Sequence, residues 1–358
     1  MGADLHAARR GRARLKLAAG KLDALLVTLD ANRYYLSGFE LHDPQSNESC
    51  GCLILFADGE DWLCTDPRYE EAAGRIWPRD RLLIYQGSAS APERLNEFLR
   101  GRLKGPLGLE TGALSLACGK ILSRGLRVRA ADGLVESLRM IKDAEEIARM
   151  RAASDLNNKL MDLAPDLLTP GRSEKDIAWE IERFYRQNGA EELSFQSIVG
   201  IGSNAALPHA RPGEDLVREN VCVLIDCGCR VRDYCSDQTR TFWVGGRPPA
   251  LFRKALDQVM EAQRLAIRAI RPGVSCKEVY AVVQDYFEDL GVFEHFNHGL
   301  GHGIGLQTHE PPALNSRNET LLEPGMITSV EPGLYYPEWG GARWERLVLV
   351  TEDGCEAL

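Results

Sequence analysis

Three closely spaced histidines are among the side chains of this sequence that could carry chemistry. The stretch HGLGHGIGLQTHE, residues 298–310, places three of the chain's seven histidines among glycines. The i,i+4 spacing of His298 and His302 occurs in helical zinc motifs, but each of these glycines costs about 1 kcal/mol in a helix. We therefore expect extended backbone, with His298 and His302 on one face and a turn that returns His309 to them.

The second half of the chain contains an internal repeat. TPGRSEKDIAWEIERFYRQNGA at 169 and RPGVSCKEVYAVVQDYFEDLGV at 271 share a Pro-Gly, a serine with an acid three residues later, an apolar helical face and a closing glycine. Each copy predicts a helix that begins with a capping box and ends near its glycine, Gly189 or Gly291. The capping pairs would be Ser173 with Asp176 and Ser275 with Glu278.

Four acidic residues occupy matching places downstream of the two helices. LVRENVCVLIDCG at 216 aligns with LLEPGMITSVEPG at 321, so that Asp226 falls on Glu331. Further on, Asp237 falls near Glu345. Two related halves therefore each supply two carboxylates, which predicts a pseudo-twofold site where the halves meet.

The first pair of acids lies on two neighbouring strands. If these strands form a hairpin centred on Val231 and Arg232, Asp226 and Asp237 lie opposite each other on one face. Two facing carboxylates repel each other, and they are tolerated when a cation or a shared proton lies between them.

The second pair would complete the site. Strand alternation places Arg343 on the face of Glu345. Four carboxylates and a histidine would form a hard, oxygen-rich site for two divalent metal ions. For any one acid alone, an unrelated surface or turn position is the better interpretation, but the repeat and the apolar strands around the acids favour the metal site.

The elements that carry these residues suggest two domains. Residues 1 to about 133 alternate strand-like and helical patterns: 22–29 and 51–59 predict buried strands, and 65–73 predicts a turn that opens a helix. Residues 135–164 predict one long helix with an apolar stripe through Ile141, Ile147 and Leu156. We expect a boundary near Gly133, with domains 1–133 and 134–358.

Composition limits the function classes. The 358 residues are 44% apolar and 27% charged with a net charge of -9, which is typical of an acidic globular protein and argues against nucleic acid as a partner. No apolar run approaches the roughly 18 residues that cross a membrane, and the basic stretch 6–26 suits an amphipathic helix better than a transit peptide. The ten cysteines are scattered without a C-x-x-C pair, so we expect reduced thiols and a cytoplasmic protein.

Several stretches together resemble the pita-bread metallopeptidases, the family of creatinase, aminopeptidase P and prolidase. They are NAALPH, LIDCGCRVRDYCSDQTRTF, HGLGHGIGLQTHE, LEPGMITSVEPGLYY and GGARWERLVLVTEDG, and ANRYYLSGF and TDPRYEEAA resemble the family's N-terminal domain. The resemblance implies an α/β (α+β) fold in which a creatinase-type α/β domain precedes a pita-bread domain with an internal pseudo-twofold repeat. This two-domain layout indicates the Xaa-Pro peptidase branch.

Carried over by position, the resemblance implies a role for each candidate residue. The ligands of two divalent ions would be Asp226, Asp237, His302, Glu331 and Glu345. The residues that line the substrate cleft or lie beside the ligands would be His209, His298, His309, Tyr335 and Arg343. Glu331 would carry a proton to the leaving nitrogen, and His309 and His209 would donate hydrogen bonds to the developing oxyanion.

The implied activity is hydrolysis of the Xaa-Pro bond of short peptides, by an Xaa-Pro dipeptidase or an Xaa-Pro aminopeptidase. Water shared by two metal ions loses a proton near neutral pH, and the bridging hydroxide can attack a peptide carbonyl. Oxygen-rich sites with one histidine accept several metals, so Mn or Co is expected and Zn or Fe is possible. A metal-free creatinase-like amidinohydrolase and a non-enzymatic binding module are the alternatives, and the complete ligand set disfavours both.

Two positions depart from the family's pattern. Asp233 stands where relatives usually have a glycine in the hairpin turn, and it also tolerates turn dihedrals. Arg346 follows the last ligand where relatives have an acid or amide, and alternation places it on the face opposite Glu345. Relatives are commonly homodimers, so the resemblance implies a homodimer for this chain as well.

Overall fold

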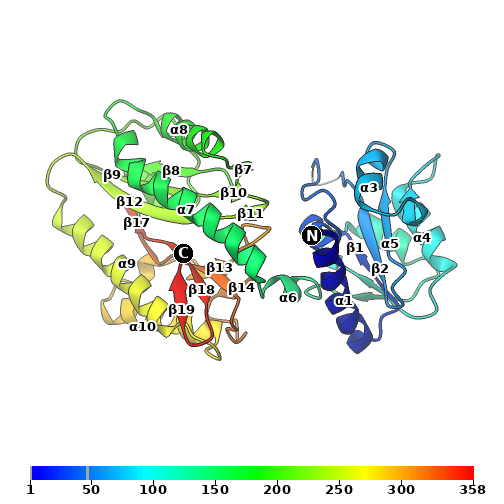
Figure 1. The fold of residues 1–358 in the computed structure, drawn as a ribbon. Coiled ribbons are helices and arrows are strands. Elements are labelled where there is room, and N and C mark those ends of the chain that lie inside the picture. Colours follow the sequence, from blue (N-terminus) through cyan, green and yellow to red (C-terminus); the bar gives the residue numbers. More distant parts are fainter. Residues whose placement is uncertain (1, 46–47) are drawn as a thin grey trace. The chain divides into compact units, whose positions relative to one another are not determined.

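The chain folds into two units that divide between Arg139 and Met140 in the computed structural model, which describes residues 2–45 and 48–358. The N-terminal unit is built on a mixed sheet with strand order β4-β3-β2-β1-β5-β6 (Figure 1). Its strands are β1 Ala24–Val27, β2 Cys52–Phe56, β3 Trp62–Thr65, β4 Leu82–Ile84, β5 Leu107–Leu109 and β6 Val128–Ala130. Its helices are α1 Gly2–Gly20, α2 Asp30–Ser37, α3 Glu70–Ile76, α4 Ala91–Arg100, α5 Leu116–Leu122 and α6 Glu136–Arg139.

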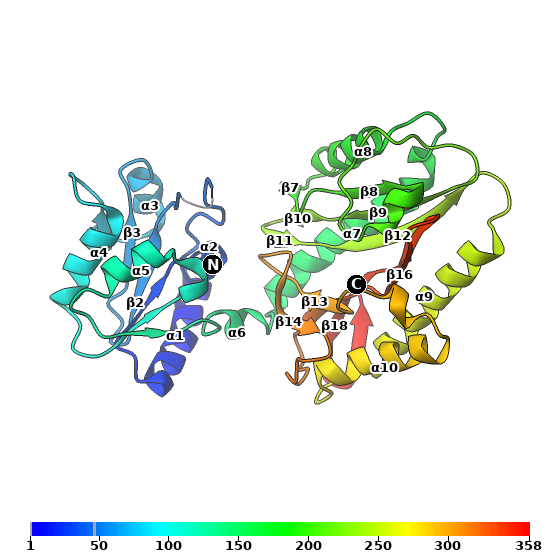
Figure 2. The ribbon, with the colours of Figure 1, turned by 180° about the vertical axis from the view of Figure 1, so that it is seen from behind.

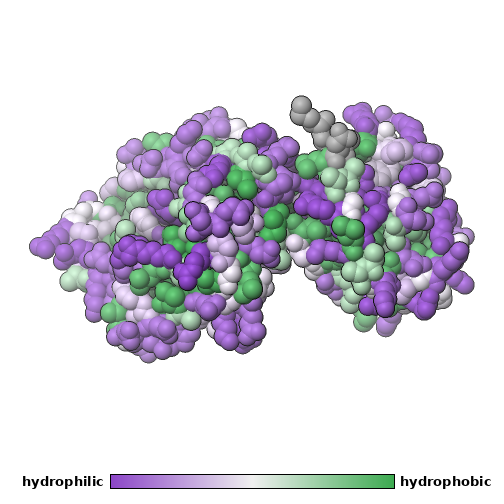
Figure 3. Space-filling view, turned by 60° about the horizontal axis from the view of Figure 1, so that its bottom comes forward, coloured by the Kyte–Doolittle hydropathy of each residue, from purple (hydrophilic) through white to green (hydrophobic). Residues whose placement is uncertain are grey.

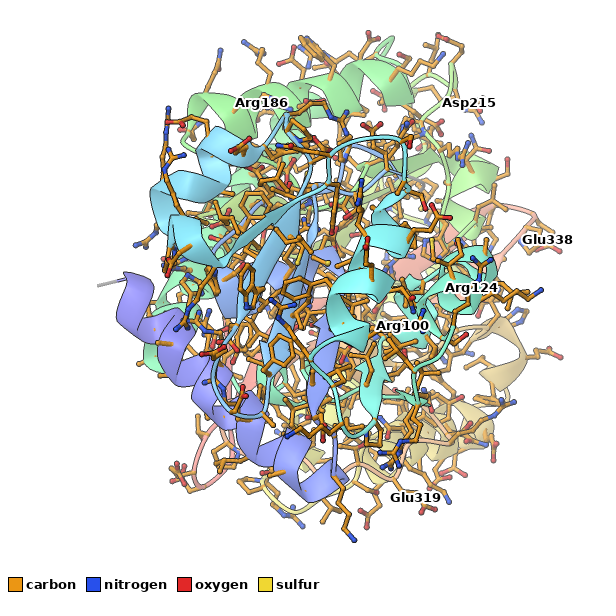
Figure 4. The ribbon with its side chains drawn as sticks, turned by 90° about the vertical axis from the view of Figure 1, so that its right-hand side faces the viewer. Arg100, Arg124, Arg186, Asp215, Glu319 and Glu338 are labelled. Carbon is orange, nitrogen blue, oxygen red and sulfur yellow. The ribbon has the colours of Figure 1, made fainter. Side chains whose placement is uncertain are left out.

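The sequence predictions for the N-terminal unit are confirmed. Strands β1 and β2 lie within the two apolar stretches, and every residue of both is buried. Helix α3 follows the turn at TDPR, and the basic N-terminal stretch forms α1, which buries Ala13 and Leu17. Arg100 at the end of α4 and Arg124 after α5 lie at the surface of this unit (Figure 4).

The single long helix predicted over 135–164 is wrong, because the chain leaves the helical path after α6. Helix α7, Ala144–Leu167, begins only after Asp143, whose carboxylate accepts hydrogen bonds from the amides of Glu145 and Glu146. The Glu146 carboxylate accepts from the Asp143 amide in return, at 2.9 Å. This capping box starts a new helix, so Ile141 lies outside the apolar stripe that we assigned to it.

The C-terminal unit contains two layers of helices around a set of short sheets. The helices are α7, α8 Glu174–Gln187, α9 Ala250–Ala269 and α10 Cys276–Asp289. Its strands are β7 Glu192–Leu193, β8 Ile198–Ile201, β9 Val221–Cys227, β10 Cys229–Val231, β11 Tyr234–Cys235, β12 Gln238–Val244, β13 Gly301–Gly303, β14 Glu310–Leu314, β15 Ile327–Val330, β16 Gly333–Tyr336, β17 Gly340–Arg343, β18 Arg346–Val350 and β19 Cys355–Ala357. They form the sheets β12-β9-β8, β14-β13-β15-β18-β19, β11-β10-β7 and β16-β17.

Each half of this unit has its own core. Apolar residues of α7 and α8 pack with β8 and β9 in one cluster, and those of α9 and α10 pack with β15 and β18 in another. Figure 1 and Figure 2 show the four helices on the outside with the strands between them. The halves therefore place their central strands, and the residues on them, in the middle of the unit.

The predicted repeat is visible in the hydrogen bonds. In the first copy the amide of Gly171 donates to the carbonyl of Val217 at 2.9 Å, and in the second the amide of Gly273 donates to that of Leu322 at 2.8 Å. Both capping boxes form as predicted, and α8 and α10 end before Gly189 and Gly291. The two copies are thus equivalent in structure as well as in sequence.

The hairpin that joins β10 and β11 turns at Arg232 and Asp233. Both residues have positive φ, 50° and 74°, as a tight two-residue hairpin turn requires. The Glu191 carboxylate accepts hydrogen bonds from the amides of both, at 3.0 Å and 2.9 Å. The hairpin centre predicted at Val231 and Arg232 is therefore wrong by one residue.

This shift changes the partner of the first candidate ligand. Asp226 on β9 pairs across the ladder with Thr239 on β12 rather than with Asp237. Because side chains alternate with a period of two, Thr239 and Asp237 share a face of the strand path. The two acids therefore still lie on the same face, as diagonal neighbours.

The surface and the thiols bear on the class of protein. Hydrophilic side chains cover much of the face seen in Figure 3, with apolar groups scattered among them. Among the described helices, none combines the length and apolar character needed to cross a membrane. The ten cysteines are free thiols.

Candidate metal centre

Central strands of both halves deliver the five predicted ligands. Asp226 lies on β9 and Asp237 precedes β12, so the first half supplies one pair of carboxylates. In the second half, Glu331 follows β15 and Glu345 precedes β18. His302 is the middle residue of β13, which pairs with β15.

Ligand atoms of Asp237, His302, Glu331 and Glu345 lie close together. One ligand atom each from Asp237, His302 and Glu345 lie within 4.8 Å of one another. The Nε2 atom of His302 is 3.3 Å from Glu331 Oε1 and 3.6 Å from Asp237 Oδ2. Its Nδ1 atom lies 3.1 Å from the carbonyl of Gly303, so that a proton on Nδ1 leaves the Nε2 lone pair facing the acids.

Two residues outside the predicted set orient these acids. The hydroxyl of Thr239 donates to Glu345 Oε2 at 2.6 Å, and the hydroxyl of Ser329 donates to Glu331 Oε1 at 2.9 Å. Ser329 Oγ also accepts from the amide of His302 at 3.0 Å. Thr239 lies two residues after Asp237, and Ser329 lies two residues before Glu331. Because side chains alternate along a strand, this spacing was the pattern that could have identified both residues.

Arg343 connects the acid cluster to the rest of the site. Its guanidinium donates to Asp226 Oδ2 at 2.7 Å, to the hydroxyl of Tyr335 at 2.8 Å and to Thr239 Oγ1 at 3.0 Å. Arg343 is 2% exposed, so the ion pair with Asp226 is shielded from water. Arg346 is exposed, whereas Glu345 is buried.

The acid cluster fits divalent cations by the chemistry of its oxygens. Asp226 Oδ1, Asp237 Oδ1 and Glu345 Oε1 are buried, and they have no hydrogen-bond partner among the described residues. Leaving a buried charged oxygen without a partner is costly, and cations are the partners that several such oxygens can share. Four carboxylates and one imidazole form a donor set that suits hard or borderline divalent ions.

Burial and mutual repulsion perturb the acids. Burial, together with Glu345 and Asp226, raises the pKa of Asp237 well above its ordinary value. Burial and the neighbouring Glu331 likewise raise the pKa of Glu345. Burial raises the pKa of Glu331 to about 7, although Arg343 opposes the shift. Without a metal ion, folding therefore raises the affinity of these three carboxyls for protons.

The metal-free protein should lose stability as the pH rises. A carboxyl whose pKa is raised by folding stabilises the folded state below its unfolded pKa, and this contribution is lost as the pH rises through the folded pKa, about 7 for Glu331. Divalent ions replace these protons, so the gain in Tm on adding Mn²⁺ should be larger at about pH 8 than at about pH 5. Thermal unfolding with and without metal across this range measures the effect, and a metal-induced gain that shrinks with rising pH would contradict it.

The three histidines of residues 298–309 make two contacts beside the acids, one between His302 and His309 and one between His298 and Tyr335. His302 and His309 lie edge to face with ring centroids 4.3 Å apart, so the turn that returns His309 is confirmed. His298 Nε2 lies 2.8 Å from the Tyr335 hydroxyl, which accepts from Arg343. Burial lowers the pKa of His298 to about 4 and also lowers the pKa of His302 and His309, so these rings are neutral near pH 7.

A cavity of about 380 Å³ opens over the cluster. The candidate residues that line it are His209, Asp226, Asp237, His298, His302, His309, Glu331, Arg343 and Glu345. Tyr335 lies behind the lining and reaches it through Arg343 and His298. The remaining walls include Phe195, Ile198, Pro208 and Arg211, which the sequence patterns did not single out.

The glycines around His302 permit close approach of backbones. A Cβ atom at Gly301 would collide with the carbonyl oxygen of Ser329, and one at Gly303 would collide with the carbonyls of Glu310 and Pro311. Gly301 and Gly303 flank the ligand on β13, so they let the histidine strand lie against its neighbours.

Replacing Gly301 by alanine should destabilise the protein. Overpacking of this kind costs about 1–3 kcal/mol, and here the obstacle is backbone that cannot rotate away. Urea unfolding of Gly301→Ala against wild type measures the loss. Gly299→Ala is the matched control, because a Cβ there would have its nearest neighbour, Leu314 O, at 3.4 Å. Equal stability of the two variants would contradict the prediction.

Comparisons with known proteins cover both units. A model of metallopeptidase family M24 matches residues 148–352, and a model of the creatinase/prolidase N-terminal domain matches residues 9–141. An uncharacterized peptidase of Staphylococcus aureus is 33% identical over 94% of each chain. The solved Xaa-Pro dipeptidase of Bacillus anthracis is 31% identical with a TM-score of 0.89, covering 98% of this chain and 97% of its own. The X-Pro aminopeptidase of Thermotoga maritima is 29% identical with a TM-score of 0.80, covering 94% of each.

Proposed function

Because the chain belongs to metallopeptidase family M24, we propose that it hydrolyses the Xaa-Pro bond of short peptides in the cavity above the acid cluster. The observation that carries the proposal is the gathering of Asp237, His302 and Glu345, together with three buried carboxylate oxygens that have no partner among the described residues. The solved relatives named for Xaa-Pro substrates support the choice of bond.

The acid cluster would hold two divalent ions. The residues that would hold them are Asp226, Asp237, His302, Glu331 and Glu345. When bound, such ions supply an activated water and polarise a peptide carbonyl. Mn²⁺ or Co²⁺ is the proposed metal, with Zn²⁺ or Fe²⁺ as alternatives that the same donor set accepts.

The chain's own residues would bind the peptide and move its protons. Glu331, held by Ser329, would carry a proton to the proline nitrogen as the bond breaks. His309 and His209 line the same cavity and would donate hydrogen bonds to the developing oxyanion. The nitrogen of proline carries no hydrogen. A site that needs no hydrogen bond from the N–H of the residue after the cleaved bond can therefore accept proline there.

The assembly and the compartment are parts of the same proposal. We propose a homodimer by resemblance to the family, and a cytoplasmic location because the free thiols suit a reducing compartment. Sedimentation of the purified protein tests the first of these, and localisation of the tagged protein tests the second.

A peptide panel tests the proposed activity. The metal-loaded protein should cleave Ala-Pro or Ala-Pro-Ala and should cleave Ala-Ala, which lacks proline, more slowly. Rates on the two proline peptides also decide between a dipeptidase and an aminopeptidase. If the metal-loaded protein leaves both proline peptides intact, the proposed function is wrong.

A further inference from the structure

One wall of the cavity is a loop that carries His209. This wall loop comprises residues 202–213, and the members that line the cavity are Pro208, His209, Ala210 and Arg211. His209 is exposed, and its imidazole makes no hydrogen bond to any residue within 2–45 and 48–358. The position of this ring therefore depends on how the backbone of the wall loop is held.

Glu174, the first residue of α8, holds the wall loop at both ends. Its side chain is fully buried. Oε1 accepts from the amide of Ile201 at 2.7 Å and from the side chain of Asn204 at 2.9 Å, and Oε2 accepts from the amide of Gly213 at 2.7 Å. Ile201 directly precedes the wall loop and Gly213 closes it, so one carboxylate joins the two ends of the loop.

The middle of the wall loop is tied to the acid cluster. Arg343 Nη1 donates to the carbonyl of Pro208 at 3.2 Å, and Nη2 of the same guanidinium donates to Asp226 Oδ2 at 2.7 Å. With its ends held by Glu174 and its middle held by Arg343, the loop gives the backbone of His209 a fixed place relative to the acids.

The internal repeat shows that the junction of helix and loop does not require an acid. In the first copy the amide of Glu174 donates to the carbonyl of Asp215 at 3.1 Å, and in the second the amide of Cys276 donates to that of Thr320 at 2.9 Å. Cys276 is buried in the apolar core of the second half. The same backbone contact therefore forms with a thiol in place of the carboxylate.

The carboxylate of Glu174 is costly to bury. Burial of a charged group without a partner is unfavourable, and among the described residues Glu174 pairs with no lysine or arginine. The partners of its two oxygens all belong to the wall loop or to the residue before it. An acid that is buried at this cost, and bonded only there, indicates a role in the cavity.

We propose that Glu174 is a positioning residue, which places the imidazole of His209 beside the reacting peptide bond by holding both ends of the wall loop. This inference rests on the proposed function, in which His209 donates a hydrogen bond to the developing oxyanion. Such a donor is most effective when it is already in place, because the protein then does not reorganise during the reaction. Glu174 is not among the residues that line the cavity, so it acts through His209.

Glu174→Gln tests the proposal, because an amide group cannot accept at both ends. Its oxygen can keep the bonds to Ile201 and Asn204, and its NH₂ group then faces the amide of Gly213, which releases one end of the loop. With Mn²⁺-loaded protein and the proline peptide that the wild type cleaves, kcat/KM should fall about tenfold or more, mainly through kcat. A misplacement of about 1 Å caused by a remote substitution costs up to about 10²-fold.

A double-mutant cycle with His209→Ala shows whether this loss depends on His209. His209→Ala alone should lower kcat about 10²-fold or more, as loss of an oxyanion donor does. In that background Glu174→Gln should change kcat/KM by less than about twofold, although it should still lower Tm. An equal loss of rate in both backgrounds, or an unchanged kcat/KM in Glu174→Gln, would overturn the proposal.

Two variants are matched controls. Glu180→Gln alters a partly exposed glutamate of the same helix that pairs with Arg183, and it should keep the wild-type kcat/KM. Ser275→Ala removes the N-cap of α10, so it should lower Tm without lowering kcat/KM. If Glu174→Gln does not fold, Asn204→Ala removes one donor to Glu174 and should show a smaller loss of rate with the same dependence on His209.

Hydrogen exchange separates this inference from the proposed function. In Mn²⁺-loaded Glu174→Gln the amides of residues 202–213 should exchange faster than in the wild type, whereas those of residues 318–320, at the equivalent junction of the second copy, should not change. If the wild type cleaves neither proline peptide but exchange changes in this way, the hydrolytic function fails and the anchoring of the wall loop stands. Equal exchange in the two proteins would overturn the anchoring.

Discussion

Removal of divalent metal by a chelator is expected to lower peptide hydrolysis by at least about 10³-fold. The acid cluster and His302 carry no positive charge with which to polarise a carbonyl, and burial raises the pKa of Asp237, Glu345 and Glu331. A bound metal ion contributes several kcal/mol to the stabilisation of transition-state charge, and each 1.36 kcal/mol is a factor of ten in rate. Rates on Ala-Pro before chelation, after it and after titration with Mn²⁺ or Co²⁺ measure the effect.

The control for this experiment is to check that the chelated protein remains folded. Circular dichroism of the chelated protein should retain the helical signal, because the apolar cores of the two halves do not include the ligands. Adding metal back should restore the rate. A protein that is fully active while metal analysis finds no bound ion would rule out the metallopeptidase mechanism, and it would favour a metal-free amidinohydrolase on this scaffold.

Replacing Glu331 by glutamine should lower kcat by about 10²–10⁴-fold, the range for loss of a general acid or base. The change retains the size of the side chain and one oxygen, but it removes the group that is proposed to carry a proton to the proline nitrogen. Steady-state kinetics on Ala-Pro with a metal content equal to that of wild type measures the loss.

The matched control for Glu331→Gln is Glu323→Gln. Glu323 lies before β15 in the same half and is exposed, so its replacement should leave kcat unchanged. If Glu331→Gln retained the wild-type kcat with both ions bound, the proton-carrying role would be wrong even though the residue still served as a ligand.

The sequence predicted the site more completely than the local geometry around it. Residue types at matching repeat positions selected the four acids, because a repeated helix and strand pattern constrains where their side chains lie, whereas His302 was selected by the resemblance to the family. The turn at Arg232 and Asp233 was misplaced by one residue, because two non-glycine residues adopt positive φ there. The contact between Thr239 and Glu345 joins residues 106 positions apart, so it depends on how the two halves pack.

The break in the predicted helix at Asp143 was, in contrast, readable in the sequence, since Asp143 and Glu146 have capping-box spacing.

The division of the carboxylates between two halves also affects the protein during its synthesis. Asp226 and Asp237 leave the ribosome first, and Glu331 follows Asp226 by 105 residues, or about 5–20 s at usual rates of translation. In that interval the nascent chain presents only one pair of the candidate acids. The proposed metal centre therefore becomes complete only when the second half has been synthesised.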